Sequence, residues 1–304
     1  MTKSHTRKRR DIYQEVTDKM VKLIEKGVSP WRCNWSKYGA AKNYATGHFY
    51  TGINAILMNL TEHPIPFFMS FKQAQKLGGK IKKGAKAEIV CFYKTLYKDE
   101  NGNFYGRQKA IALAEMGVEL ETIPMLKHYN VFNVQDIEGI EIETPQVQLK
   151  QHEKIEACES IINGFSNPPE FICENADEAY YSVKRDKLNM PQMGQFKTAE
   201  AYYLTLFHEL VHSTGHPKRL NRDGLGQKFG NTKYSKEELI AEMGASFLSA
   251  QTGIDIEDLT ENSAAYLKGW LSALKGDKKL IFKAAAEAQK AVDLITGTQR
   301  HYQD

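Results

Sequence analysis

The chain has 304 residues, of which 41% are hydrophobic and 26% are charged, and its formal net charge is +4 at pH 7. This composition is typical of a globular protein and excludes a low-complexity or disordered chain, while the length favours two domains. No apolar run approaches the ~18 residues that a membrane helix needs, so we expect no membrane partner. The basic N-terminus is not followed by the apolar segment of a secretory signal. The four cysteines show no paired spacing, and we expect reduced thiols in a cytoplasmic protein.

The first predicted element is an amphipathic helix over residues 11–26. Apolar residues such as Val16 and Met20 recur in it at helical spacing, and a glycine follows the last turn. The same spacing predicts two short helices further along, over residues 53–60 and 71–77. The N-terminal region is therefore expected to contain helices as well as the strands that follow.

Residues 28–60 interleave aromatic with basic side chains. The residues of this kind are Trp31, Trp35, Tyr38, Tyr44, Phe49 and Tyr50, together with Arg32, Lys37 and Lys42. Aromatic faces can stack on unpaired bases while lysine and arginine meet phosphates, which is the combination that single-strand binders use. The alternative is that the tryptophans form the core of a small domain. The candidate nucleic-acid contacts in this segment are Trp31, Lys42, Tyr50 and Asn54.

Lysines also crowd around Gly84, just before a predicted strand over residues 87–95. A lysine run is usually a solvated face, but beside an aromatic strand phosphate contact is the alternative that we carry forward. The candidate contacts in this region are Lys72, Lys80, Lys82, Lys83 and Lys86. With a second predicted strand over residues 128–134, the N-terminal part is expected to be an α+β domain of residues 1–140.

The charge is divided unevenly along the chain. Residues 1–130 hold 22 Lys and Arg against 11 Asp and Glu, whereas residues 131–304 hold 19 against 26. A basic half joined to an acidic half suggests that the basic half meets a polyanion such as nucleic acid. Residues 141–151 are polar and contain a proline, so we interpret them as a linker to a second domain of residues 152–304.

The second domain is predicted to begin with a helix over residues 153–165 and a β-hairpin with strands over residues 180–183 and 188–190. The hairpin comes just before the helix that carries the main motif, and its edge strand could hold an extended peptide by β-addition. A protein or peptide substrate is therefore a candidate partner. Two amphipathic helices, over residues 261–274 and 278–295, are expected to close the domain.

The helix predicted from Thr198 to Gly215 carries the strongest chemical signal. His208 and His212 stand at i and i+4 on one helical face, where two imidazoles can bind a single Zn²⁺. Glu209 lies beside such a metal and can take a proton from a metal-activated water. The alternative is a chance match of two histidines and a glutamate. We predict Zn²⁺ as the cofactor, with Mn²⁺ as another candidate, and Glu209 as the catalytic base.

The third ligand decides the class of the site, because catalytic zinc has three protein ligands and an open position. The candidate is Glu238, in the helical segment of residues 234–250, and Glu242 at i+4 is the candidate carboxylate behind a ligand histidine. Glu237 falls on another face. Glu238 has a second explanation, because Ser235 and Glu238 match a capping box, and a capping glutamate would point away from a metal.

Several stretches in a fixed order resemble ArdC-type antirestriction proteins and the N-terminal region of plasmid TraC-type primases. These stretches are FYTGINAILM, SFKQAQKLGGKIKKGAK, YNVFNVQDIEGI, AEAYYLTLFHELVHSTGH, YSKEELIAEMGASFLSA and ENSAAYLKGWLSALKGDKKLIF. The similarity runs from about Ile12 to Gly297 and is far more specific than the two histidines alone. It implies an N-terminal single-stranded-DNA-binding domain and a C-terminal zincin-like metallopeptidase domain, in proteins of mobile elements that protect incoming DNA from restriction.

The resemblance also bears on the site. It matches His208, Glu209 and His212 to the metal motif and Glu238 to the acidic helix that follows, as in gluzincin metallopeptidases. Metallopeptidase analogy asks for a Tyr or His that stabilises the oxyanion, for which Tyr234, His216 and Tyr266 all qualify. His216 sits in a Gly-His-Pro turn, so it is expected behind the ligands or in solvent.

We therefore expect an α+β fold in which a small α+β domain that binds single-stranded DNA precedes a zincin-like, gluzincin-type α+β metallopeptidase domain. The expected function is that of an antirestriction protein with single-stranded DNA as partner and a zinc metallopeptidase-like domain. The alternative is a DNA-binding module whose metal site is structural and not proteolytic.

Overall fold

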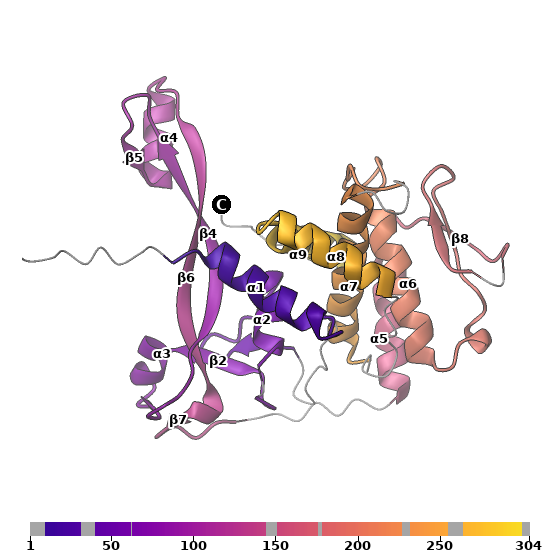
Figure 1. Cartoon of the computed structure of the whole chain (residues 1–304), viewed down its shortest axis with the longest axis horizontal. Helices are drawn as coiled ribbons and strands as arrows, with labels where there is room; N and C mark the ends of the chain where they lie inside the picture. Colours follow the sequence, from indigo (N-terminus) through magenta and orange to yellow (C-terminus); the bar gives the residue numbers. More distant parts are fainter. Residues whose placement is uncertain are drawn as a thin grey trace, which may run out of the picture.

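The computed structural model describes residues 10–31, 40–61, 63–143, 151–175, 178–226, 232–254 and 264–299. A long two-stranded ribbon marks the N-terminal part, and a packed group of helices marks the C-terminal part (Figure 1). The predicted α+β class is confirmed. In the described part of the chain, no helix combines the length and the apolar character that a membrane crossing requires.

The N-terminal part is built on a five-stranded sheet with the strand order β1-β2-β6-β4-β5. Its strands are β1 (Lys42–Asn43), β2 (Phe67–Ser70), β4 (Glu88–Lys98), β5 (Phe104–Tyr105) and β6 (Glu121–Asn133). β4 pairs antiparallel with β6 over its whole length, from Glu88 opposite Val131 to Lys98 opposite Glu121. Because the other strands are short, this ribbon projects beyond the sheet and carries α4 (Arg107–Glu115) near its far end (Figure 1).

Helices support the base of this ribbon. Asp11 caps α1 (Ile12–Glu25) by accepting a hydrogen bond from the backbone N–H of Gln14 at 3.2 Å. The buried residues of α1 recur at helical spacing, at Ile12, Val16, Thr17, Met20 and Ile24. The other elements of this part are α2 (Ile53–Asn59), α3 (Phe71–Lys76), a 3₁₀ turn (Val134–Asp136), and the antiparallel pair of β3 (Lys80–Ile81) and β7 (Ile137–Glu138).

The C-terminal part is mostly helical. It contains α5 (Gln151–Gly164), α6 (Ala199–Thr214), α7 (Thr232–Thr252), α8 (Ala264–Gly276) and α9 (Leu280–Thr296). Between α5 and α6 lie β8 (Glu170–Ile172), β9 (Tyr180–Ser182), β10 (Lys187–Asn189) and a 3₁₀ turn (Met193–Gln195), and the three strands form a sheet in the order β8-β10-β9. The predicted hairpin is confirmed as the antiparallel β9–β10 pair, and β9 is an edge strand.

One hydrophobic core joins the two parts. It includes Met20 and Trp31 from the N-terminal part and Leu239 and Trp270 from the C-terminal part. The indoles of Trp31 and Trp270 meet edge to face with their centroids 5.0 Å apart, and Ser246 donates a hydrogen bond to the backbone carbonyl of Trp31. The two parts therefore share one packed core, although the sequence predicts a linker between two domains over residues 141–151.

The predicted helices and the strands at residues 87–95 and 128–134 are confirmed, but the sequence missed how far the ribbon extends. β6 begins at Glu121, well before the predicted start of that strand, and α4 was not predicted. β6 contains Pro124 and several polar residues, and α4 has one buried residue, Ala110. Apolar periodicity is therefore weak where both faces of an element meet water.

Candidate metal centre

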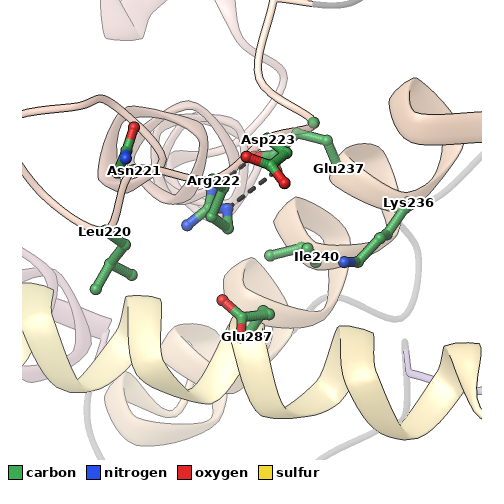
Figure 2. Close-up of a pocket in the computed structure, with 9 residues that line it drawn as sticks. Leu220, Asn221, Arg222, Asp223, Lys236, Glu237, Ile240 and Glu287 are labelled. Atoms are coloured by element: carbon green, nitrogen blue, oxygen red, sulfur yellow. Dashed lines mark hydrogen bonds and ion pairs between the residues drawn. The ribbon is translucent and has the colours of Figure 1, made fainter.

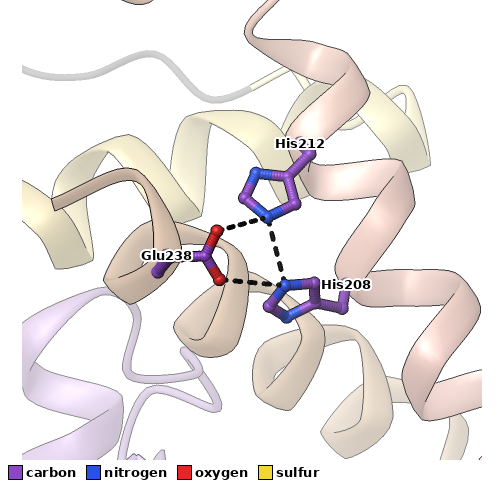
Figure 3. Close-up of side chains that lie close together, drawn as sticks. All are labelled: His208, His212 and Glu238. Atoms are coloured by element: carbon purple, nitrogen blue, oxygen red, sulfur yellow. Dashed lines mark hydrogen bonds and ion pairs between the residues drawn. The ribbon is translucent and has the colours of Figure 1, made fainter. Parts of the chain in front are cut away.

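Helix α6 presents two histidines on its face toward α7. Its N-terminal cap is Thr198, whose hydroxyl accepts a hydrogen bond from the backbone N–H of Ala201 at 3.1 Å, as predicted for this helix. The side chains that α6 buries in the core are Tyr203, Leu206, Phe207, Leu210, Val211, Ser213 and Thr214. Burial of this face fixes the rotation of the helix and leaves His208 and His212 turned toward α7 (Figure 3).

A glycine brings α7 close to α6. A Cβ atom at Gly244 would lie 2.6 Å from Cγ2 of Val211, which is closer than real carbon contacts allow. Gly244 therefore permits the two helices to pack at short range, and Glu238, which lies nearly two helical turns earlier on α7, comes within reach of the histidines. The sequence does not reveal this contact, because it depends on a pair of residues in different helices.

The side chains of His208, His212 and Glu238 form a triangle (Figure 3). The two Nε2 atoms are 3.1 Å apart. Oε1 of Glu238 is 3.4 Å from Nε2 of His212, and Oε2 of Glu238 is 3.5 Å from Nε2 of His208. Among the described residues, this is the group of His, Cys, Asp and Glu side chains that could hold a metal ion.

The spacing of these atoms fits a divalent metal. Ligands at about 2.0 to 2.1 Å from a tetrahedral Zn²⁺ are separated from one another by about 3.3 to 3.4 Å. The two Nε2 atoms are 3.1 Å apart, and each lies 3.4 or 3.5 Å from its nearer oxygen of Glu238, which is close to that value. Two imidazole nitrogens and one carboxylate also match the donors found in catalytic zinc sites. The three side chains are therefore arranged to hold such an ion between them.

The charges around His212 favour a cation at this point. Burial acts most strongly and lowers the pKa of His212, but hydrogen bonds to Glu237 and Glu238 outweigh it and raise the pKa to about 10. Burial likewise acts to raise the pKa of Glu238, while hydrogen bonds to His208 and His212 bring it far below its usual range. Positive charge is thus stabilised between these carboxylates, as a site for a divalent cation requires.

Glu237 and Arg222 lie behind His212. Oε1 of Glu237 is 3.3 Å from Nδ1 of His212, on the side of the ring away from the triangle. The guanidinium of Arg222 donates to both carboxylate oxygens of Glu237, at 2.6 and 2.9 Å, and also to the backbone carbonyl of Val211 at 2.8 Å and the hydroxyl of Thr214 at 2.7 Å. Burial alone would raise the pKa of Glu237, but these partners lower it to about 2. Glu237 therefore stays ionised and orients the imidazole.

Sequence reasoning missed this role of Glu237. It set Glu237 on another face of the helix and chose Glu242 as the carboxylate behind a ligand histidine. In the structure, Oε1 of Glu242 is 3.8 Å from Nδ1 of His208, so both acids approach the outer nitrogen of a histidine, Glu237 more closely. One signal could have found this role: each of the two histidines needs a partner for its outer nitrogen, and α7 carries an acid on either side of Glu238, namely Glu237 and Glu242.

One other expectation about this site is overturned, and the role of Glu209 stays a prediction. The capping-box explanation for Glu238 is wrong, because α7 begins at Thr232 and Ser235 lies inside the helix. The predicted base Glu209 follows His208 on α6, is partly exposed, and acts on His212 through its charge.

Of the candidates for oxyanion stabilisation, one lies among the described side chains. Nδ1 of His216 accepts a hydrogen bond from the backbone N–H of Lys218 at 3.2 Å and lies 3.8 Å from Oδ2 of Asp186. Its near neighbours are thus the β9–β10 turn and its own loop. The side chains of Tyr234 and Tyr266 lie outside the described set.

The aromatic and amide candidates for nucleic-acid contact occupy structural positions. Trp31 is 1% exposed, so its predicted stacking on a base is corrected to a core role, while Trp35 lies outside the described residues. Asn54 accepts from the backbone N–H of Cys91 at 2.8 Å and donates to the carbonyl of Cys91 at 2.7 Å, which closes the open edge of β4. Tyr50 is half-buried against Phe68.

The lysine candidates remain at the surface. Nζ of Lys42 lies 4.4 Å from the ring centroid of Phe67, and Nζ of Lys82 donates to the carbonyl of Gln135 at 2.6 Å. Four more are exposed on α3, on β3 and in the turn that follows, namely Lys72, Lys80, Lys83 and Lys86. Their contact with phosphate stays a prediction.

A cavity of about 320 Å³ lies beside the Arg222–Glu237 pair (Figure 2). It is lined by the loop after α6, the first turns of α7 and Glu287 of α9. Its lining mixes charges of both signs, with Lys236, Asp223 and Glu287 around it. The cavity therefore borders the residues that hold His212.

Two family models match the chain. The model for the N-terminal domain of the anti-restriction factor ArdC matches residues 10–132, and a model for zincin-like metallopeptidases matches residues 163–287. The match to the second model contains His208, His212 and Glu238. The two models divide the chain in the same order as the sheet and the helical part.

Solved structures and curated proteins give the same picture. The metal-free crystal structure of the antirestriction protein ArdC from plasmid R388 is 32% identical, with a TM-score of 0.73, and covers 96% of this chain and 100% of that chain. Its Mn(II)-bound structure is 34% identical, with a TM-score of 0.72, covering 97% and 100%. An uncharacterized protein, y4eC, from Sinorhizobium fredii is 30% identical over 95% of this chain and 92% of its own length.

The chain is also 31% and 30% identical to two DNA primases named TraC from Escherichia coli, over 94% of this chain in each case, but it spans only 27% and 20% of their lengths. Together with the site geometry, the zincin-like match and the Mn(II)-bound relative support a divalent metal as cofactor, with His208, His212 and Glu238 arranged to bind it.

Proposed function

Because the chain belongs to the ArdC family of antirestriction proteins, we propose that it acts in the cytoplasm on DNA entering the cell and binds that DNA as a single strand through its N-terminal part. The C-terminal part then acts as a metal-dependent peptidase. The first proposal is supported by the basic N-terminal sequence and its exposed lysines. The second rests on one observation, the distances of 3.1, 3.4 and 3.5 Å that separate the two imidazole nitrogens from each other and from the carboxylate of Glu238.

His208, His212 and Glu238 would hold a divalent metal, and such an ion would supply a Lewis acid for a carbonyl group and for water. Glu209 follows the first ligand and is partly exposed, so it can receive a proton as the general base. Glu237 keeps the outer nitrogen of His212 engaged, which leaves Nε2 free to face the metal. In the sheet formed by the described strands, β9 lies at the edge, where an extended peptide can add as a further strand.

The DNA proposal is tested by binding of a short fluorescent oligonucleotide over a range of salt concentrations. Phosphate contacts release counterions, so affinity should fall with salt with a slope of about −0.7 for each contact to a single strand. A duplex of the same sequence should bind more weakly. Absence of binding to the single strand, or binding that salt does not weaken, would rule this proposal out.

The peptidase proposal is tested with Glu209→Gln and a mixture of quenched fluorescent peptides. The variant should keep one equivalent of metal but lose cleavage by a factor of about 10² or more, since the general base is removed and the ligands stay. Glu156→Gln, at an exposed position on α5, is the matched control and should cleave as the unmodified protein does. Full activity of Glu209→Gln would refute the assignment.

A structural role for the metal is the second candidate. It is favoured by the position of the ligands, which link α6 to α7 where the two helices pack most closely. Metal binding would then contribute to the free energy of folding. In that case chelation should lower the melting temperature strongly, and Glu209→Gln should protect incoming DNA from restriction as well as the unmodified protein. A variant that is stable without metal and fails to protect DNA would exclude this role.

A further inference from the structure

A row of aromatic rings runs from the core onto the β4–β6 ribbon. Phe68 is fully buried, and the ring of Tyr50 meets it edge to face with the centroids 6.2 Å apart. Tyr129 lies close enough to Tyr50 to add to the effect of burial in raising the pKa of that phenol. Tyr129 in turn packs on Phe92 across the two strands, with the centroids 5.9 Å apart. We call Tyr50, Tyr129 and Phe92 the aromatic strip.

The outer end of the strip is open to solvent. Phe92 is 44% exposed and Tyr129 is 41% exposed, although aromatic side chains of this size are usually covered. Successive side chains of a strand point to opposite faces, and Tyr93 points the other way, where its hydroxyl meets that of Tyr13 on α1 at 3.1 Å. Helix α1 therefore covers one face of the ribbon, and Phe92 and Tyr129 stand on the other.

Two lysines flank the exposed rings. Lys127 is directly opposite Phe92 in the β4–β6 ladder, and Lys94, two residues further along β4, points to the same face. Among the described residues, neither lysine forms a salt bridge, and the acids of the two strands on this face, Glu88 and Glu121, lie at opposite ends of the β4–β6 ladder. The rings thus lie beside positive charge that no described carboxylate neutralises.

We propose that the exposed rings of the aromatic strip, Phe92 and Tyr129, stack against bases of single-stranded DNA while Lys94 and Lys127 contact its phosphates. This inference rests on the proposed DNA binding and gives it a location, on the ribbon and not at Trp31. Bases of a regular strand rise about 3.4 Å each, so rings 5.9 Å apart suit an extended strand with separated bases. A duplex keeps its bases stacked inside and offers the rings no base face.

The rings are tested with the double variant Phe92→Ala/Tyr129→Ala in the full-length protein. Stacking on an aromatic ring contributes about 1 to 3 kcal/mol per base, so affinity for an oligothymidylate should fall at least tenfold with two rings removed. Phe171→Ala, at a position on β8 that is 43% exposed, is the matched control and should bind normally. Both variants should stay folded at the assay temperature, which melting curves check, because none of these rings belongs to the buried core.

The lysines are tested with Lys94→Gln/Lys127→Gln. Two lost phosphate contacts should reduce the steepness of the salt dependence by about 1.4. Lys197→Gln, an exposed lysine of the C-terminal part, should leave the slope unchanged. A slope unaltered in the double variant would overturn the role of these lysines.

A direct probe is Phe92→Trp. If a base stacks at this position, the oligothymidylate should quench the fluorescence of the added indole, whereas the fluorescence of the indole added by Phe171→Trp should not change. If the unmodified protein binds the oligonucleotide with a normal salt slope but the ring variants bind equally well, the strip proposal fails and DNA binding stands. If the unmodified protein does not bind at all, the proposed function itself fails. Quenching without any loss in the alanine variants would also contradict a role of the strip in affinity.

Discussion

Arg222 is the residue on which the orientation of His212 depends. Its side chain is 5% exposed and that of Glu237 is 4% exposed. Each residue is therefore the main partner that compensates the buried charge of the other. The four hydrogen bonds of the guanidinium also tie this pair to the backbone of α6 and to Thr214. A rigid link thus runs from the end of α6 through Arg222 and Glu237 to the outer nitrogen of a proposed ligand.

We predict that Arg222→Lys weakens metal binding by about 10-fold or more, because lysine keeps the charge but not the two-pronged hydrogen bonding to Glu237. Calorimetric titration with Mn²⁺ measures the affinity directly and does not depend on any catalysis. Arg185→Lys is the control, since Arg185 pairs with Glu174 at the surface. Equal Mn²⁺ affinity in Arg222→Lys and the unmodified protein would show that this pair does not position the ligand.

Asp186 fastens the β9–β10 turn to the loop after α6. Its carboxylate accepts hydrogen bonds from Arg219, from the hydroxyl of Tyr181 at 2.7 Å and from Lys218 at 3.3 Å. Burial acts to raise the pKa of Asp186, but Arg219 and Tyr181 lower it to about 2. Its φ of +51° is a left-handed conformation that Asp and Asn tolerate better than other side chains.

The lowered pKa of Asp186 makes the stability of the folded protein depend on pH. The folded pKa of Asp186 is depressed, so its stabilisation is fully present above the unfolded value of about 3.9 and is lost as the pH falls toward about 2. Asp186→Asn keeps the left-handed turn but removes the charge. We predict that the variant unfolds at lower urea than the unmodified protein at pH 6, and that the gap narrows at pH 3. A gap that stays constant or widens on acidification would contradict it.

At the residue scale, the sequence could predict the two histidines because helical spacing relates them to one another within one segment, and it could predict Glu238 because the acidic helix that follows resembles that of gluzincin metallopeptidases. It could not predict which acid orients which histidine, because that depends on how α7 is rotated against α6, and the rotation decides whether Glu237 or Glu242 faces a given imidazole. The role of Trp31 could not be predicted from the sequence for a similar reason. An aromatic residue beside basic ones resembles a stacking site, and only its contact with Trp270 reveals the core.

At the scale of elements, the packing of α6 on α7 sets the site. The triangle needs both helices at a fixed separation, and Gly244 provides it by leaving room for Val211. The spacing of the three ligand side chains is therefore a property of the helix pair. A small change in this packing should disturb metal binding without touching a ligand.

We predict that Gly244→Ala lowers the free energy of unfolding by about 1 to 3 kcal/mol, because the added methyl group would lie 2.6 Å from Cγ2 of Val211 and must push the helices apart. Metal affinity should fall as well. The control is Gly276→Ala, since a Cβ there meets nothing within 4 Å. Urea denaturation and Mn²⁺ titration measure both effects, and a Gly244→Ala protein as stable as the unmodified one would argue against close helix packing as the cause.

The β4–β6 ribbon shows which elements sequence patterns can predict. The base of the ribbon contains the buried residues of both strands and is predicted from the sequence, whereas its outer half contains no buried residue and gives no apolar pattern to follow. Pairing with the partner strand, and not burial, determines the length of these strands. The same exposure is what makes the outer rings and lysines available to a ligand.

At the scale of the whole molecule, the basic part and the metal-binding part share one core. Thr17 of α1 donates a hydrogen bond to the backbone carbonyl of Lys278 at 2.8 Å, and the backbone N–H of Gly52 donates to Gln289 of α9 at 3.1 Å. Lys278 also pairs with Asp11 at 2.5 Å. The sequence predicts two domains because charge and motifs change near residue 140, but neither feature reports on packing between segments far apart in the chain.

This shared core leads to a prediction that separates the two explanations of Trp31. If its indole fills the contact between the two parts, Trp31→Ala should lower the free energy of unfolding by about 3 to 5 kcal/mol. It should shift one common transition of both parts, because neither loses its packing alone. Near-UV circular dichroism and urea denaturation follow the transition. Phe104→Ala, an exposed aromatic residue at the ribbon tip, should change stability little. If Trp31→Ala instead left stability unchanged and reduced only affinity for single strands, the indole would be a stacking platform and the parts would fold independently.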